Sequence, residues 1–106
     1  MSDDRIERAQ KMVDLAPDNE LARFSLGKAL FDAERYADAL PHFQVAIDKR
    51  SDWMAVHILI GKCHLCLGNK IAARAALEQA RQLALQQKHA SPLAETEQLL
   101  EDLDAS

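Results

Sequence analysis

The chain has 106 residues, of which 48% are hydrophobic and 28% charged, and it contains only three Gly, three Pro and two Cys. This length suits one domain with one modest core, and no Gly/Ser-rich linker marks a second domain. Residues 1–88 carry 13 Lys and Arg against 12 Asp and Glu, and the remainder carries five acidic residues and no basic one. Because no basic stripe is available to neutralise phosphates, we expect no nucleic-acid partner.

The sequence indicates neither export nor membrane insertion. It begins with the acidic segment Met1-Ser2-Asp3-Asp4 in place of a basic region followed by an apolar one, and its apolar runs are short. Cys63 and Cys66 are too few and too close for a secreted disulfide framework. We therefore expect a cytoplasmic protein with no membrane partner and no cofactor.

Helical periodicity first appears over residues 3–15. The segment Pro17-Asp18-Asn19 then predicts a stop and the N-cap of a helix that runs from about Glu20 to Ala33. A further helix is predicted from about Ala37 to Lys49. Pro41 is expected in its first turn, where backbone N–H groups lack intrahelical partners and a proline costs least.

Three helices are predicted in the second half of the chain. Asp52 is expected to cap the first of them, and Gly68 is expected to end it in the left-handed conformation. The next helix covers residues 71–87. The order Ser91-Pro92 is typical of an N-cap and a first helical residue, so an acidic last helix is predicted over residues 91–104.

The predicted helices repeat at one constant offset along the chain. Gly61 lies 34 positions after Gly27, and Leu77 follows Phe43 at the same offset. Glycine inside a helix costs about 0.8 to 1 kcal/mol, so its return at the same phase indicates that two helices approach closely there. A period of about 34 residues is typical of helix-turn-helix units that stack on copies of themselves.

The repeated positions resemble the motif of the tetratricopeptide repeat (TPR) family. The residues that carry the resemblance are Leu26-Gly27, Tyr36, Ala39, Phe43 and Ala46, then Ile60-Gly61, Gly68, Ala73, Leu77 and Ala80. The chain is most similar to small TPR domains of the bacterial type. The resemblance implies an all-α fold, a right-handed α-solenoid of about six helices that forms a single domain over residues 1–106. Its parts are an N-terminal half repeat or cap (3–15), repeat 1 (20–53), repeat 2 (54–87) and a C-terminal acidic capping helix (91–104).

Both ends of the repeat array depart from the family pattern. Ala9 and Met12 lie one repeat length before Phe43 and Ala46, so residues 3–15 correspond to the second helix of a repeat whose first helix is missing. At the other end, two positions that should face a following repeat carry arginine, at Arg74 and Arg81. We therefore expect the last helix to pack as an irregular cap.

One stripe of each first helix lines a concave groove in the TPR family. The corresponding residues here are Leu21, Phe24, Lys28, Phe31, Ala55, Ile58, Lys62 and Leu65. The lining is apolar with two lysines in register, which suits an amphipathic helix or an extended peptide with apolar anchors and one or two carboxylates. The resemblance thus implies a non-catalytic module, a scaffold or adaptor that binds an unidentified protein or peptide.

Two alternatives concern the same groove. The chain's own N- or C-terminal helix could cover the apolar lining, since monomers rarely leave a large apolar patch exposed, and the acidic leucine-bearing last helix is a suitable occupant. A homodimer through the groove or the open end could also supply the burial that two repeats lack.

Binding of heat-shock chaperone tails is not implied. Family members that bind these acidic tails use a clamp of Lys, Asn and Arg at set positions of the first helices. At those positions this chain has Phe24 and Lys28 in one helix, and Leu59 replaces the Asn in the next.

No constellation of residues indicates catalysis or a closed metal site. Cys63 and Cys66 share one side of a helix and His57 lies nearby, so a metal-responsive regulator is a further alternative. We instead expect Cys63 to be a core residue, because it occupies the small-residue position that Ala29 fills in repeat 1. His42 and the other isolated histidine, His89, are expected to be solvated.

Overall fold

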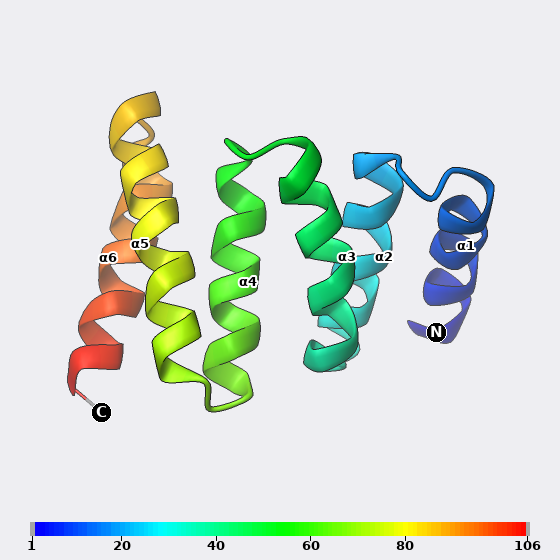
Figure 1. The fold of residues 1–106 in the computed structure, drawn as a ribbon. Coiled ribbons are helices and arrows are strands. Elements are labelled where there is room, and N and C mark those ends of the chain that lie inside the picture. Colours follow the sequence, from blue (N-terminus) through cyan, green and yellow to red (C-terminus); the bar gives the residue numbers. More distant parts are fainter. Residues whose placement is uncertain (1, 106) are drawn as a thin grey trace. The chain divides into compact units, whose positions relative to one another are not determined.

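The computed structural model describes residues 2–105, and these form six α-helices without any strand (Figure 1). The helices are α1 (Ser2–Leu15), α2 (Glu20–Asp32), α3 (Tyr36–Lys49), α4 (Met54–Cys66), α5 (Lys70–Gln87) and α6 (Ala90–Ala105). The prediction of an all-α chain of about six helices is confirmed. None of these helices is both long enough and apolar enough to cross a bilayer. The chain forms two compact units, residues 1–51 (unit 1) and residues 52–106 (unit 2).

In unit 1, α2 packs against both α1 and α3. The helices α2 and α3 approach closely at Gly27, where an added Cβ atom would lie 2.7 Å from Cε1 of Phe43. A side chain at this position would therefore collide with the Phe43 ring, which is completely buried. The expectation that Gly27 lies at a close contact between helices is confirmed.

Unit 2 repeats this arrangement in α4 and α5. An added Cβ atom at Gly61 would lie 2.7 Å from Cδ2 of Leu77, which is also completely buried. The third helix of the unit, α6, packs against α5. The same residue phase thus makes the same glycine-mediated contact in both units.

The starts of three helices test the capping predictions. Asn19 caps α2 as predicted, since its side-chain oxygen accepts a hydrogen bond of 2.9 Å from the Ala22 N–H. The predicted caps of two later helices are wrong. Trp53, not Asp52, precedes α4, and its side chain makes no capping hydrogen bond. Ser91 lies inside α6, which begins at Ala90.

The helices α2 and α4 end with the same pair of backbone hydrogen bonds, which is also found after α5 at Lys88 and His89. After α4, the Gly68 N–H donates to the Leu65 carbonyl and the next N–H donates back to His64, and Gly68 has φ +79° as predicted. After α2, the residue at the equivalent position is Glu34, with φ 62°. A glycine and a glutamate therefore occupy the same left-handed position in the two units.

Pro41 lies deeper in its helix than predicted. Because α3 begins at Tyr36, Pro41 is in the second turn, after the helical bond from the Ala39 N–H to the Arg35 carbonyl. The proline therefore removes one intrahelical hydrogen bond that a residue in the first turn would not make. The prediction was wrong because even a helix that starts at Ala37 has Pro41 as its fifth residue, just past the first turn.

Candidate protein-binding surface

The predicted stripe on α2 lies at the surface of unit 1. Leu21 is 57% exposed. The half-buried Phe24 ring has its centroid 6.3 Å from that of Phe43, and the half-buried Phe31 ring meets Tyr36 edge-on at 5.4 Å. Each aromatic side chain of the stripe thus keeps one side fixed on a neighbour, while the stripe as a whole stays accessible.

Lys28 is held in place within this stripe. Its ammonium group lies 5.9 Å from the centroid of the Phe31 ring and 2.8 Å from Asp32 Oδ1. Hydrogen bonding from Lys28, opposed by partial burial and aided by Arg5, lowers the pKa of Asp32 below its ordinary value. The carboxylate therefore stays charged near neutral pH and orients both cations.

The equivalent stripe on α4 of unit 2 has a different environment. Ala55 is exposed and Leu65 is half-buried. Ile58 is only 6% exposed and belongs to a buried cluster of α4 and α5 against which Leu93 and Leu99 of α6 pack. The other residues of that cluster are Met54, Ala80, Leu83 and Ala84.

The C-terminal helix also pairs with the charges of unit 2. Lys62 Nζ of the stripe lies 2.7 Å from Glu95 Oε2 of α6. The two arginines that depart from the repeat pattern pair with α6 as well, Arg74 with Asp104 and Arg81 with Glu97. The last helix thus brings leucines and carboxylates to the α4 stripe and to α5, as expected for an occupant supplied by the chain itself.

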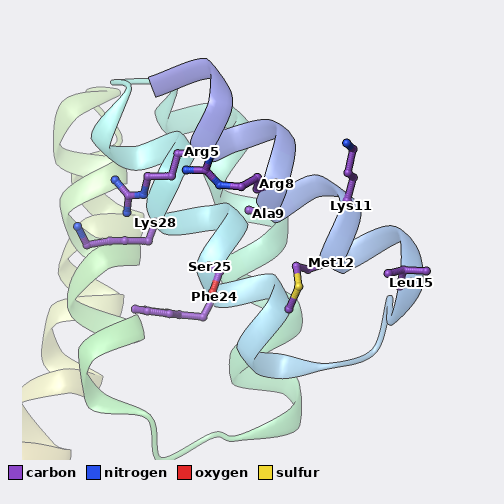
Figure 2. A pocket seen from close by; sticks show the side chains of 9 residues that line it. All are labelled: Arg5, Arg8, Ala9, Lys11, Met12, Leu15, Phe24, Ser25 and Lys28. Carbon is purple, nitrogen blue, oxygen red and sulfur yellow. The ribbon is translucent and has the colours of Figure 1, made fainter. Parts of the chain in front are cut away.

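Unit 1 contains a pocket of about 530 Å³ between α1 and α2 (Figure 2). From α1 it is lined by Arg5, Arg8, Ala9, Lys11, Met12 and Leu15, and from α2 by Phe24, Ser25 and Lys28. Figure 2 shows Met12 reaching from α1 toward α2, with Arg5 and Lys28 close together at the far end. The pocket therefore joins two residues of the predicted stripe to a cationic and apolar face of α1.

Two of the pocket's four cations are available to a ligand. Arg5 Nη1 donates to Asp32 Oδ2 at 2.7 Å, so Arg5 and Lys28 share one carboxylate. Arg8 and Lys11 are exposed and make no ion pair with any residue that the structure describes. The apolar side chains beside them are unusually open, with Met12 58% and Leu15 86% exposed. The pocket thus offers apolar contacts and unpaired positive charge together.

The contribution of α1 was not among the predicted site residues. The sequence did contain a signal for it. Met12 lies one repeat length before Ala46, which is completely buried, so a large apolar residue stands in α1 where α3 has a small one. Which side chains of α1 stay open depends on its packing against α2, and the repeat offset does not specify that packing.

The expectation that His42 is solvated is wrong. Its ring is partly buried, and its Nδ1 lies 3.1 Å from Arg23 Nη1. Arg23 has only donors, so the neutral His42 ring accepts this hydrogen bond. Burial, followed by repulsion from Arg23, lowers the pKa of His42. Arg23 Nε also donates to the Pro17 carbonyl at 2.7 Å, so one arginine links the segment before α2 to α3.

The two cysteines differ in their surroundings. Cys63 is completely buried, as expected for a small core residue, whereas Cys66 is exposed. Burial raises the pKa of the Cys63 thiol to about 11, and the neighbouring Cys66 contributes to the same shift. Among residues 4–105, whose side chains the structure describes, no three His, Cys, Asp or Glu residues gather in a group that could hold a metal ion.

The chain was compared with known proteins. No family model matches the sequence. The Hsp70-Hsp90 organizing protein of Triticum aestivum is 34% identical over 65 residues, which are 61% of this chain and 11% of that protein. The chain therefore spans about a tenth of the length of the curated relative it matches.

Solved structures match nearly the whole chain. PcrH of Pseudomonas aeruginosa, in complex with the chaperone binding region of PopD, aligns with a TM-score of 0.90 and 24% identity over 98% of this chain and 79% of that one. The TPR2B domain of yeast Sti1, in a complex with an Hsp70 peptide, aligns with a TM-score of 0.84 and 18% identity over 94% and 80%. The chain has the TPR fold. Sequence identities of 24% and 18% establish a shared fold and nothing further.

Proposed function

We propose that this TPR chain is a non-catalytic protein-interaction module that binds a peptide or helix of a partner protein. The observation that carries the proposal is the pocket of unit 1, where Met12, Leu15 and Phe24 lie beside two cations without ion-pair partners in the described residues. Contiguous exposed apolar side chains beside unpaired charge are typical of protein-binding surfaces. The TPR domains that are similar in structure were determined with partner segments, which supports the same kind of role.

The binding surface in this proposal is narrower than the eight-residue stripe. Leu21, Phe24, Lys28 and Phe31 of α2 serve the partner, together with the α1 side of the pocket. Ile58 and Lys62 of the unit 2 stripe instead hold α6, because Ile58 lies in the buried cluster and Lys62 pairs with Glu95. The C-terminal helix is thus an internal occupant of the α4 stripe.

The proposed domain organisation keeps the repeat boundaries. Residues 3–15 act as a half repeat, residues 20–53 and 54–87 as two full repeats, and residues 91–104 as the acidic cap of a single interaction domain. We place this domain in the cytoplasm, where its thiols stay reduced, and expect neither a nucleic-acid nor a membrane partner.

Affinity capture with a matched pair of variants tests the proposal. The wild-type chain, a Phe24→Ala, Lys28→Glu variant and an Ile71→Ser control are immobilised, and proteins retained from a lysate of the source organism are quantified by mass spectrometry. Ile71 is 90% exposed and lies outside unit 1, so its replacement changes surface hydrophobicity without touching the pocket. We expect a partner that the wild type and the control retain and the double variant loses. Equal retention by all three chains would remove the pocket from the proposed function.

A further inference from the structure

One face of α1 borders a pocket, whereas the same face of α3 and of α5 is completely buried. Ala39, Phe43 and Ala46 of α3 are completely buried, and so are the α5 residues one repeat length later. The α1 residues one repeat length earlier are Arg5, Ala9 and Met12, and all three line the pocket. The positions that are completely buried in α3 and α5 therefore border a pocket in α1, where Arg5 and Met12 are exposed and Ala9 is 7% exposed.

The covering helix is known from the two complete pairs. It is the first helix of each pair, and it presents glycine to a large apolar residue, Gly27 to Phe43 and Gly61 to Leu77. In α1 the large residue is replaced by Ala9. A helix placed against α1 in the same way therefore has room for a large side chain where α2 and α4 need glycine.

We infer that the pocket between α1 and α2 binds an acidic amphipathic helix of a partner protein, against the α1 face that corresponds to the buried faces of α3 and α5. This inference rests on the proposed function, because it names the partner class of the same pocket. Charge complementarity selects the acidic helix, since the pocket is lined by Arg5, Arg8, Lys11 and Lys28, and the ion pairs of these cations with described residues involve only Asp32. The partner's apolar face covers Met12 and Leu15.

Two other occupants fit the charges less well. A second copy related by a twofold axis would bring the same cations face to face, because such an interface uses the same patch on both subunits. The chain's own acidic helix is engaged within unit 2, where three of its five carboxylates pair with Lys62, Arg74 and Arg81. The acidic helix in the pocket is therefore assigned to a different protein.

The test uses three peptides derived from α2. The peptides have 13 residues, the length of both first helices, α2 and α4. The acidic probe has the α2 sequence with Arg23→Glu, Gly27→Leu and Lys28→Glu. The second peptide keeps Gly27 and is otherwise identical to the acidic probe. The third keeps Arg23 and Lys28 and carries Glu20→Lys, Gly27→Leu and Asp32→Lys, so that it is cationic. Binding to the whole chain is followed by backbone amide NMR shifts, and the helicity of the bound peptide by circular dichroism.

We expect the acidic probe to bind as a helix and to shift the amides of α1 and α2. Loss of either its leucine or its negative charge should weaken binding about tenfold. Arg8→Glu with Lys11→Glu in the protein should weaken it by a similar factor, and both residues are exposed, so this variant keeps its fold. Lys49→Glu with Lys70→Glu, a matched change outside the pocket, should leave binding unchanged.

Four results would each overturn the inference: no binding at about 1 mM probe, equal binding of the cationic peptide, shifts confined to residues outside α1 and α2, or a dimeric mass that falls to monomer when probe is added. The failure of the proposed function is distinguishable from these. If the peptide test fails but a natural partner is retained by the wild type and lost by the Phe24→Ala, Lys28→Glu variant, the proposed interaction module stands. Only the inference of an acidic helix in the pocket is then withdrawn.

Discussion

The two units share the same helix-packing contact but differ in how far their surfaces are covered. In both, a helix pair closes on a glycine that faces a large apolar side chain, Phe43 in unit 1 and Leu77 in unit 2. In unit 2 the stripe residue Ile58 is buried in a cluster on which α6 packs, whereas its counterpart Phe24 lies in an open pocket. The repeat motif therefore specifies how a pair of helices packs, and the helix beyond the pair decides whether its surface is free to bind.

The largest effect is expected at the shared contact itself. Gly27→Val should lower the free energy of unfolding by about 3 kcal/mol, because the new methyl groups overlap the rigid Phe43 ring. Gly61→Val should cost about 1 kcal/mol less, since the Leu77 side chain can rotate away. Urea unfolding measures both values. In a double-mutant cycle, adding Phe43→Ala to Gly27→Val should recover part of the stability lost through Gly27→Val. If the free-energy losses of the two substitutions were strictly additive, the contact between positions 27 and 43 would be contradicted.

The next effect separates the covered stripe from the open one. Ile58→Ala should cost about 3 kcal/mol, because Ile58 is 6% exposed within a packed cluster. Phe24→Ala should cost less than half as much, although phenylalanine is larger, because Phe24 is only half-buried. The comparison is made by urea unfolding of the two variants. Equal losses of unfolding free energy would mean that Ile58 and Phe24 are buried to the same extent.

A smaller effect is expected at the turns that end α2 and α4. Glu34→Gly should raise the free energy of unfolding by about 1 kcal/mol, because a side chain at φ 62° is strained. Gly68→Ala should lower it by a similar amount, although no atom lies within 4 Å of the added Cβ. Thermal unfolding of the two variants provides the readout. Shifts of the same sign would contradict the equivalence of these positions.

The smallest effect is a pH dependence at His42 of unit 1. The pKa of folded His42 lies below the ordinary value of 6.5, so the unfolded chain takes up the proton first as pH falls. The stability that His42 contributes is complete above pH 6.5 and is lost as pH falls through the lowered pKa. The His42→Asn variant should therefore show a shallower decline in its urea midpoint from about pH 7 to about pH 5. If the urea midpoints of the wild type and the variant declined in parallel, the pKa of His42 would be the same in the folded and unfolded chain.

Much of the helical framework could be predicted from the sequence. The repeat offset identified the glycine contacts, since Gly27 and Gly61 return at one phase, and Asn19 was recognisable as a cap from its residue type. The error at Asp52 arose from a helix start misplaced by one residue, and the error at Pro41 arose from misjudging where the first turn ends. Local patterns predict helices well because periodicity is a local property, but a cap depends on single positions.

The surface was harder to predict because it depends on contacts between distant segments. The pairing of Arg74 with Asp104 spans 30 residues, and the repeat pattern showed only that an arginine replaced an apolar residue. The role of α1 likewise depends on how it packs against α2 to form the pocket, which the repeat offset does not specify. The candidate site was therefore predictable in its α2 half and not in its α1 half.

Site-specific photo-crosslinking tests the central claim, that the open surface of unit 1 is the binding surface, most directly. Met12→p-benzoylphenylalanine places the crosslinker in the pocket, and Ile71→p-benzoylphenylalanine places it on an exposed apolar site of unit 2. Irradiation in a lysate of the source organism should yield a protein adduct from position 12 and none from position 71. Adducts from position 71 alone, or the same adducts from both positions, would contradict the account.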